Sequence, residues 1–222
     1  MRRRDLVRVC ALLPVAALPA CIGGGGRQDG VLRMAVAAPP RNLDPRLATD
    51  ATSERVNRLL YRRLVELDPS GLPTPGIARW ERASPVHYRF HLKGGGRAFT
   101  NGARLDARDV AATYESILAP GSLSPHGVLL SVIRGIETRG PDRVDVRLEA
   151  PDPLFPAYLG IGILPASALE AEHPFVERPI GSGGFRLAGR PEPGRLRLER
   201  RRDAQPVELV GVKDPSVRVM KL

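Results

Sequence analysis

The placement of the cysteines limits what this chain can fold into more than any other feature of its sequence. The 222 residues include two cysteines, Cys10 and Cys21. No disulfide can cross-link the chain beyond Cys21, so the folded part must be held together by a hydrophobic core. From Val31 onward the composition is that of a globular protein, and this part is long enough for one sizeable domain or two small ones.

The first 21 residues have the three parts of an export signal. A cationic start is followed by an apolar stretch over residues 9–18, and small residues precede Cys21. Ten apolar residues span about 15 Å as a helix, which is about half of a bilayer's hydrocarbon core. The segment is therefore predicted to be a signal peptide and not a transmembrane anchor. The cationic residues are Arg2, Arg3, Arg4 and Arg8.

The end of this signal, Leu18-Pro19-Ala20-Cys21, resembles a bacterial lipobox, in which signal peptidase cuts before the cysteine and the cysteine sulfur is lipidated. Residues 22–30, with their run of glycines, are predicted to be a flexible tether between the acylated Cys21 and the folded body. These features predict a lipoprotein of the cell envelope, periplasmic and attached to the membrane through Cys21. An ordinary secretory signal and an uncleaved buried segment are the alternatives, and the export route, general secretory or twin-arginine, stays open.

The formal charge of +10 raises the question of a nucleic-acid partner. Of the 34 basic residues, all but Lys93, Lys213 and Lys221 are arginines, mostly scattered singly. The one cluster beyond the predicted signal peptide, residues 200–202, has no interleaved aromatic residues on which bases would stack. No nucleic-acid partner is expected.

Hydropathy patterns predict an α+β fold with mixed strands and few helices. Asp50 and Asp106 are N-cap residue types, and apolar residues follow both at helical spacing. The turn Gly140-Pro141-Asp142 lies between two segments that predict a β-hairpin. The predicted helices span about 52–64 and 106–118, a short helical passage lies within 152–173, and further strands are predicted at 31–37, 87–92, 185–188, 196–199 and 207–212.

No set of residues in the sequence predicts catalysis or metal binding. His87 and His91 lie four apart in a predicted strand, which separates them by about 13 Å, whereas two ligands of one ion lie within roughly 4 Å of each other. Ser182 lacks the Gly-x-Ser-x-Gly spacing of a nucleophile elbow. Four histidines and no thiol beyond Cys21 supply no nucleophile, base and orienting group, so we expect no enzyme, no metal site and no cofactor.

Several segments in a fixed order resemble the extracytoplasmic solute-binding proteins of ABC importers for oligopeptides, dipeptides and nickel, known as solute-binding protein family 5. The resemblance covers most of residues 42–218. The segments are "NLDPRLATD", "LLYRRLVELDPSGLPTPGIARWE", "YRFHLKGGGRAFTNGARLDARDVAATYESI", "RVDVRLEAPDPLF", "IGSGGFRL" and "VGVKDPSVRV".

The resemblance implies a two-lobed clamp of the periplasmic-binding-protein type II kind that closes on its solute. Residues 31–222 are expected to be a partial solute-binding domain, the mixed-sheet first lobe, with the second lobe missing. Within it, about 52–165 would form an inserted subdomain and 166–222 would return to the first sheet.

The resemblance also indicates two candidate site segments. The loop after the first strand is expected to border the ligand cleft, although a surface connection stiffened by prolines is equally compatible with its sequence. Its candidate ligand-binding residues are Pro40, Arg41, Asn42, Leu43 and Asp44. The second segment stands where the family has Gly-Thr-Gly-Pro-Tyr and is expected near the hinge or cleft, and its residues are Gly181, Ser182, Gly183, Gly184 and Phe185.

The implied function is the capture of peptides or a related small solute for transport across the inner membrane. The implied partners are the solute, the permease and ATPase subunits of an ABC importer, and the membrane, through the lipid anchor. The alternative is a truncated, non-transporting envelope lipoprotein that acts through a protein partner.

Overall fold

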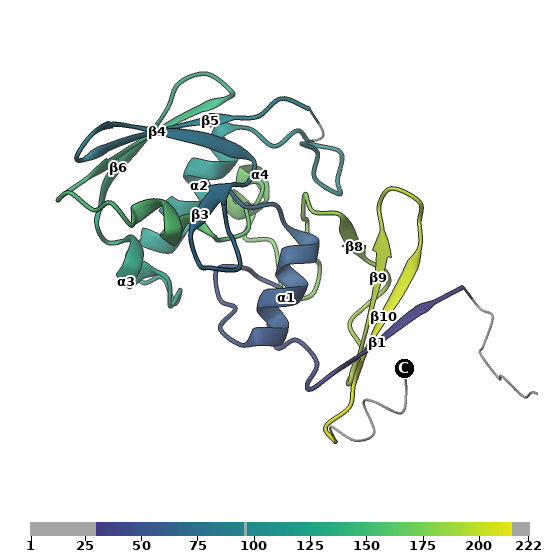
Figure 1. The fold of residues 1–222 in the computed structure, drawn as a ribbon. Coiled ribbons are helices and arrows are strands. Elements are labelled where there is room, and N and C mark those ends of the chain that lie inside the picture. Colours follow the sequence, from purple (N-terminus) through teal and green to yellow (C-terminus); the bar gives the residue numbers. More distant parts are fainter. Residues whose placement is uncertain (1–29, 96, 215–222) are drawn as a thin grey trace, which may run out of the picture.

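The computed structural model describes residues 30–95 and 97–214, so the predicted signal peptide, Cys21 and nearly all of the predicted tether lie outside the described residues. Figure 1 shows two four-stranded sheets at opposite ends of the molecule, with helices between them. The predicted α+β class with mixed strands is confirmed. No helix in the described part of the chain is long and apolar enough to cross a membrane.

The first sheet joins strands from both ends of the described chain (Figure 1). Its order is β1-β10-β9-β8. β1 runs parallel to β10, with Leu32 opposite Val207, and the other pairs are antiparallel, so the sheet is mixed. The strands are β1 (Leu32–Val36), β8 (Phe185–Leu187), β9 (Arg195–Arg200) and β10 (Pro206–Gly211).

The second sheet is antiparallel throughout and has the order β4-β5-β7-β6. It contains the predicted hairpin and the predicted strand at 87–92. A separate two-stranded sheet carries the proline-rich segment. The strands of these two sheets are β2 (Val65–Leu67), β3 (Pro73–Pro75), β4 (Ala78–Ser84), β5 (His87–Leu92), β6 (Ile133–Thr138) and β7 (Arg143–Leu148).

The two longest helices begin where the sequence predicts. α1 (Ala51–Leu60) is capped by the Asp50 carboxylate, and α2 (Ala107–Leu118) by a capping box that joins Asp106 and Asp109. α1 ends four residues before the predicted position 64, because Tyr61 is extended and the next backbone groups bond elsewhere. The short helices are α3 (Gly127–Leu130), α4 (Ala166–Glu170) and the 3-10 helix η1 (Phe155–Leu159).

A separate hydrophobic cluster supports each of the two four-stranded sheets. The second sheet packs on α2 and η1, where Phe90, Tyr114 and Phe155 are fully buried. The first sheet packs on α1 through Leu196, Leu198 and Leu209. The cluster of the first sheet also fixes the position of the loop that follows β1, because Leu43 is one of its members.

Candidate functional site

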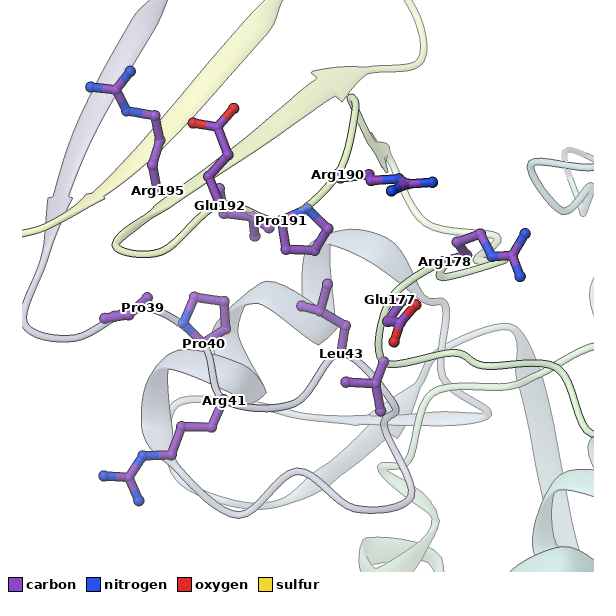
Figure 2. A pocket seen from close by; sticks show the side chains of 12 residues that line it. Pro39, Pro40, Arg41, Leu43, Glu177, Arg178, Arg190, Pro191, Glu192 and Arg195 are labelled. Atoms are coloured by element: carbon purple, nitrogen blue, oxygen red, sulfur yellow. The ribbon is translucent and has the colours of Figure 1, made fainter.

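A cavity of about 470 Å³ lies beyond the carboxyl end of β1 (Figure 2). Its volume is within the roughly 300–1,000 Å³ that small-molecule sites occupy. Three separate stretches form it: the loop after β1, the segment 176–178, and the turn between β8 and β9 with the start of β9. The lining residues are Pro39, Pro40, Arg41, Leu43, Val176, Glu177, Arg178, Arg190, Pro191, Glu192, Arg195 and Leu196.

The first wall of the cavity is held by the start of α1. The fully buried Ser53 hydroxyl accepts hydrogen bonds from the backbone N–H groups of Arg41, at 2.8 Å, and Asn42, at 3.0 Å. It donates to the Asp50 carboxylate at 2.5 Å. Asp50 also accepts from the N–H groups of Thr52 and Ser53, so one carboxylate both caps the helix and orients the hydroxyl that holds the loop.

The second wall is held at the end of β10. Gly194, with φ of +76°, turns the chain between β8 and β9, and its carbonyl accepts a 2.8 Å hydrogen bond from the N–H of Gly211. A Cβ on Gly211 would lie 3.1 Å from Pro39 Cδ. The loop and the turn therefore both contact the same glycine, which fixes the two walls relative to each other.

Three of the five predicted ligand-binding residues, Pro40, Arg41 and Leu43, line this cavity. Asn42 and Asp44 do not line it, because their side chains stabilise the loop. The Asn42 Oδ1 accepts from the N–H of Asp44 at 2.8 Å, and the buried Asp44 carboxylate accepts from Arg46 Nε and Nη2 at 3.1 and 2.7 Å. The assignment of ligand contact to any of the five remains a prediction.

The segment 181–185 contributes no residue to this cavity. It crosses the carboxyl end of α1, where the N–H of Gly183 donates to the Leu60 carbonyl at 2.7 Å. The buried Ser182 hydroxyl accepts from the N–H of Arg62 at 3.3 Å, and Phe185 packs against the core of the first sheet. The predicted role near a hinge or cleft stays a prediction.

Sequence reasoning did not predict the rest of the lining. Arg178 and Arg190 are more than a hundred positions away from the loop after β1, and each stands singly in its segment. The pairing of β1 with β10 and of β10 with β9 brings the turn with Arg190 to the loop, and the shared core cluster of Phe175 and Leu43 brings the segment with Arg178 there. One signal was present: Pro191-Glu192-Pro193-Gly194 is a turn-forming sequence directly before a predicted strand.

Positive charge prevails around the cavity, whose lining contains four arginines and two glutamates. The charge of one of these arginines, Arg41, affects the pKa of Asp50. Burial raises the pKa of that carboxyl, but the hydrogen bonds from Ser53 and Thr52 and the charge of Arg41 outweigh burial and lower the pKa below its usual value.

The histidines in β5 do not meet at one ion. His87 Nε2 lies 3.4 Å from the Asp145 carboxylate, whereas His91 lies 3.9 Å from Glu81. Among residues 30–95 and 97–214, no group of three or more histidine, cysteine, aspartate or glutamate side chains is arranged to hold a metal ion.

Solved structures define the class of protein to which this fold belongs. NikZ from Campylobacter jejuni, in complex with Ni(L-His), matches with a TM-score of 0.76 and 23% identity over 86% of this chain and 41% of its own. AgaA from A. tumefaciens R10, in complex with agropinic acid, matches with a TM-score of 0.78 and 25% identity over 86% of this chain and 42% of its own. AppA from Bacillus subtilis, in complex with a nonapeptide, matches with a TM-score of 0.75 and 22% identity over 86% of this chain and 42% of its own. The fold is that of part of a type II periplasmic binding protein.

The family follows from the sequence match. Residues 43–214 match the model of the bacterial extracellular solute-binding proteins, family 5 Middle, and the chain belongs to this family. Curated relatives include the HTH-type transcriptional regulator SgrR of Escherichia coli K12 and of Shigella dysenteriae, each 31% identical over 161 residues. The match covers 70% of this chain and 27% of each regulator, so the chain spans about a quarter of those relatives.

Proposed function

We propose that the protein is the extracytoplasmic solute-binding lipoprotein of an ABC importer, and that it captures peptides or a related small solute for transport. It binds and releases its solute without forming a covalent bond. Its partners are the solute and the permease and ATPase subunits of the importer.

One observation carries this proposal: the loop after β1, which resembles a cleft-bordering loop of the family, lines a cavity of ligand size. The loop is rigid, because two backbone N–H groups bond to Ser53 and prolines fix φ at positions 39 and 40. A rigid loop loses little conformational entropy when a solute binds. Family membership over residues 43–214 supports the same function.

The membrane anchor rests on the sequence around Cys21. Each acyl methylene that enters the bilayer contributes about 0.8 kcal/mol, and two signals or chains suffice for stable anchoring. The anchor keeps the binding protein at a membrane of the cell envelope.

The experiment that tests the proposal is solute uptake by cells that lack the gene. Uptake of labelled peptides and of small labelled acids is measured in the parent, in the deletion strain and after complementation. We expect the deletion to lower uptake of at least one solute class and the intact gene to restore it. Unchanged uptake of every class would argue against a transport role.

A second candidate function is solute sensing, and the similarity to the SgrR regulators favours it. In this function the same cavity binds a small molecule, but the bound state is communicated to a protein partner and no solute is moved. The two functions differ in location and in uptake: an exported protein whose loss lowers uptake is a transport component, whereas a protein that stays in the cytoplasm is a sensor.

A further inference from the structure

We infer that the cavity is selective for solutes that carry an acid group, and that Arg178 and Arg190 bind this group. The inference rests on the proposed function, because it names the solute class of the same site. Neither arginine was among the residues that the sequence indicated.

The ion pairs around the cavity leave a positive excess. Arg195 Nε lies 3.3 Å from Glu208 Oε1, and Glu192 Oε1 lies 3.6 Å from Arg197 Nη1. These two lining residues are therefore paired with partners on β9 and β10, although Glu208 also pairs with Arg33 and Arg197. Among the described residues, the side chains of the other four charged lining residues form no ion pair or hydrogen bond, and these are Arg41, Arg178, Arg190 and Glu177.

The directions of the side chains separate these arginines. In Figure 2 the guanidinium groups of Arg178 and Arg190 extend toward the same side of the view, whereas Arg41 extends toward the opposite side. Arg41 also acts on Asp50, whose pKa its charge helps to lower, after the larger effects of burial and hydrogen bonding. Arg178 and Arg190, which belong to two segments of the cavity wall, are thus the two arginines that we assign to the acid group of the solute.

An acid group satisfies this pair better than a neutral group does. Guanidinium groups donate forked, charge-assisted hydrogen bonds to a carboxylate, which are roughly twice as strong as hydrogen bonds between neutral groups. A neutral amide of the same shape forms only the weaker bonds, and a cation is repelled. Glu177 lowers the affinity for an acid group, because its negative charge lies in the same lining.

The surrounding residues suit a small solute with one such end. Pro39, Pro40 and Pro191 have no rotatable side chain to immobilise. With Leu43, Val176 and Leu196 they form the apolar part of the lining. An apolar wall beside a few charged groups is the usual composition of a small-molecule site.

The test compares two probes of equal length and shape, glutarate and its diamide glutaramide. Dissociation constants for the full chain are measured by NMR titration, which detects weak binding and locates it. We expect glutarate to bind at least about five times more tightly than glutaramide, with shifted amide signals in 176–178 and 190–196. Added salt should reduce the difference, because it screens partly exposed charges.

Three variants identify the groups responsible. Arg190→Gln and Arg178→Gln should each weaken glutarate binding about five- to tenfold and leave glutaramide binding unchanged. Glu177→Gln should strengthen glutarate binding. Arg134→Gln is the matched control, because Arg134 is exposed on β6 outside the cavity and its replacement alters the net charge equally.

The outcomes separate this inference from the proposed function. Equal binding of both probes, or an equal loss in the Arg134 control, would overturn acid selectivity and leave solute binding intact. Binding of peptides with amidated C-termini and no acidic side chain at this cavity, without any binding of glutarate, would do the same. If neither the probes nor any peptide bind there, the inference and the proposed function fail together.

Discussion

The backbone N–H of Gly183 donates a 2.7 Å hydrogen bond to the carbonyl of Leu60 and thereby joins a glycine-rich segment to the last turn of α1. The approach is so close that a Cβ on Gly183 would lie 2.2 Å from the Leu59 oxygen, and a Cβ on Gly181 would lie 1.9 Å from the Leu60 oxygen. Both clashes are with backbone atoms, which cannot rotate away. Glycine is therefore required at these two positions by packing.

This contact predicts a graded result for alanine substitutions in one short segment. Gly181→Ala and Gly183→Ala should each lower the free energy of unfolding by ~3 kcal/mol, because the backbone of α1 must move. Gly184→Ala should have little effect, since no atom lies within 4 Å of its added Cβ and its φ is not positive. Urea denaturation of the three variants measures the differences, and equal stability of all three would contradict the packing explanation.

Ser53 should matter for both stability and binding. Ser53→Ala removes the acceptor for two backbone N–H groups and the donor to Asp50, which should cost about 1–3 kcal/mol of unfolding free energy and loosen the loop after β1. Solute affinity should fall in the same variant. Thr52→Ala is the control, because Thr52 contacts the Asp50 carboxylate through its backbone N–H, which alanine keeps. A Ser53 variant that kept native stability and affinity would show that the loop is held by other contacts.

Acid should weaken the start of α1. Burial raises the pKa of Asp50, but hydrogen bonds from Ser53 and Thr52 and the charge of Arg41 bring it below the ordinary value. A lowered folded-state pKa adds stability above the unfolded-state pKa of about 3.9, and this stability is lost as the pH falls through the folded-state pKa.

Asp50→Asn isolates this effect, because asparagine also caps helices but does not titrate in this range. The difference in unfolding free energy between the native chain and the variant should be largest near pH 7 and should shrink below pH ~4. Denaturant titrations at both pH values measure it. A difference that does not change with pH would mean that Asp50 has the same pKa in the folded and unfolded states.

Removal of the Cys21 thiol tests the membrane anchor. Cys21→Ala should move the protein from the membrane fraction to the released fraction, because no acyl chain can then be attached. Cys10→Ala is the matched control and should leave the protein in the membrane fraction. Retention of the Cys21 variant in the membrane would refute the lipobox assignment.

The elements predicted correctly are those with short-range signals. Alternation defines β5, and the carboxylates of Asp50 and Asp106 define the starts of α1 and α2. β4 lacks such a signal, because it is an edge strand with mostly exposed residues and is formed through its pairing with β5.

Short-range signals also explain why only part of the candidate site could be predicted from the sequence. The loop after β1 is recognisable from its position in the sequence, but Asn42 and Asp44 were assigned to ligand contact when their spacing also fits an Asx turn, which the structure has. The opposite wall, with Arg178 and Arg190, depends on the long-range pairing of β1 with β10 and on the packing of Phe175 in the cluster that contains Leu43, which no local pattern encodes.

Hydrogen exchange of the full chain, with and without a mixture of peptides and small acids, tests most directly whether this cavity is a solute site. Solute binding predicts slower amide exchange in residues 41–43, 176–178 and 190–196, and unchanged exchange in the distant sheet that contains β5. Protection that appears only outside these segments, or none with any solute at millimolar concentration, would contradict the account.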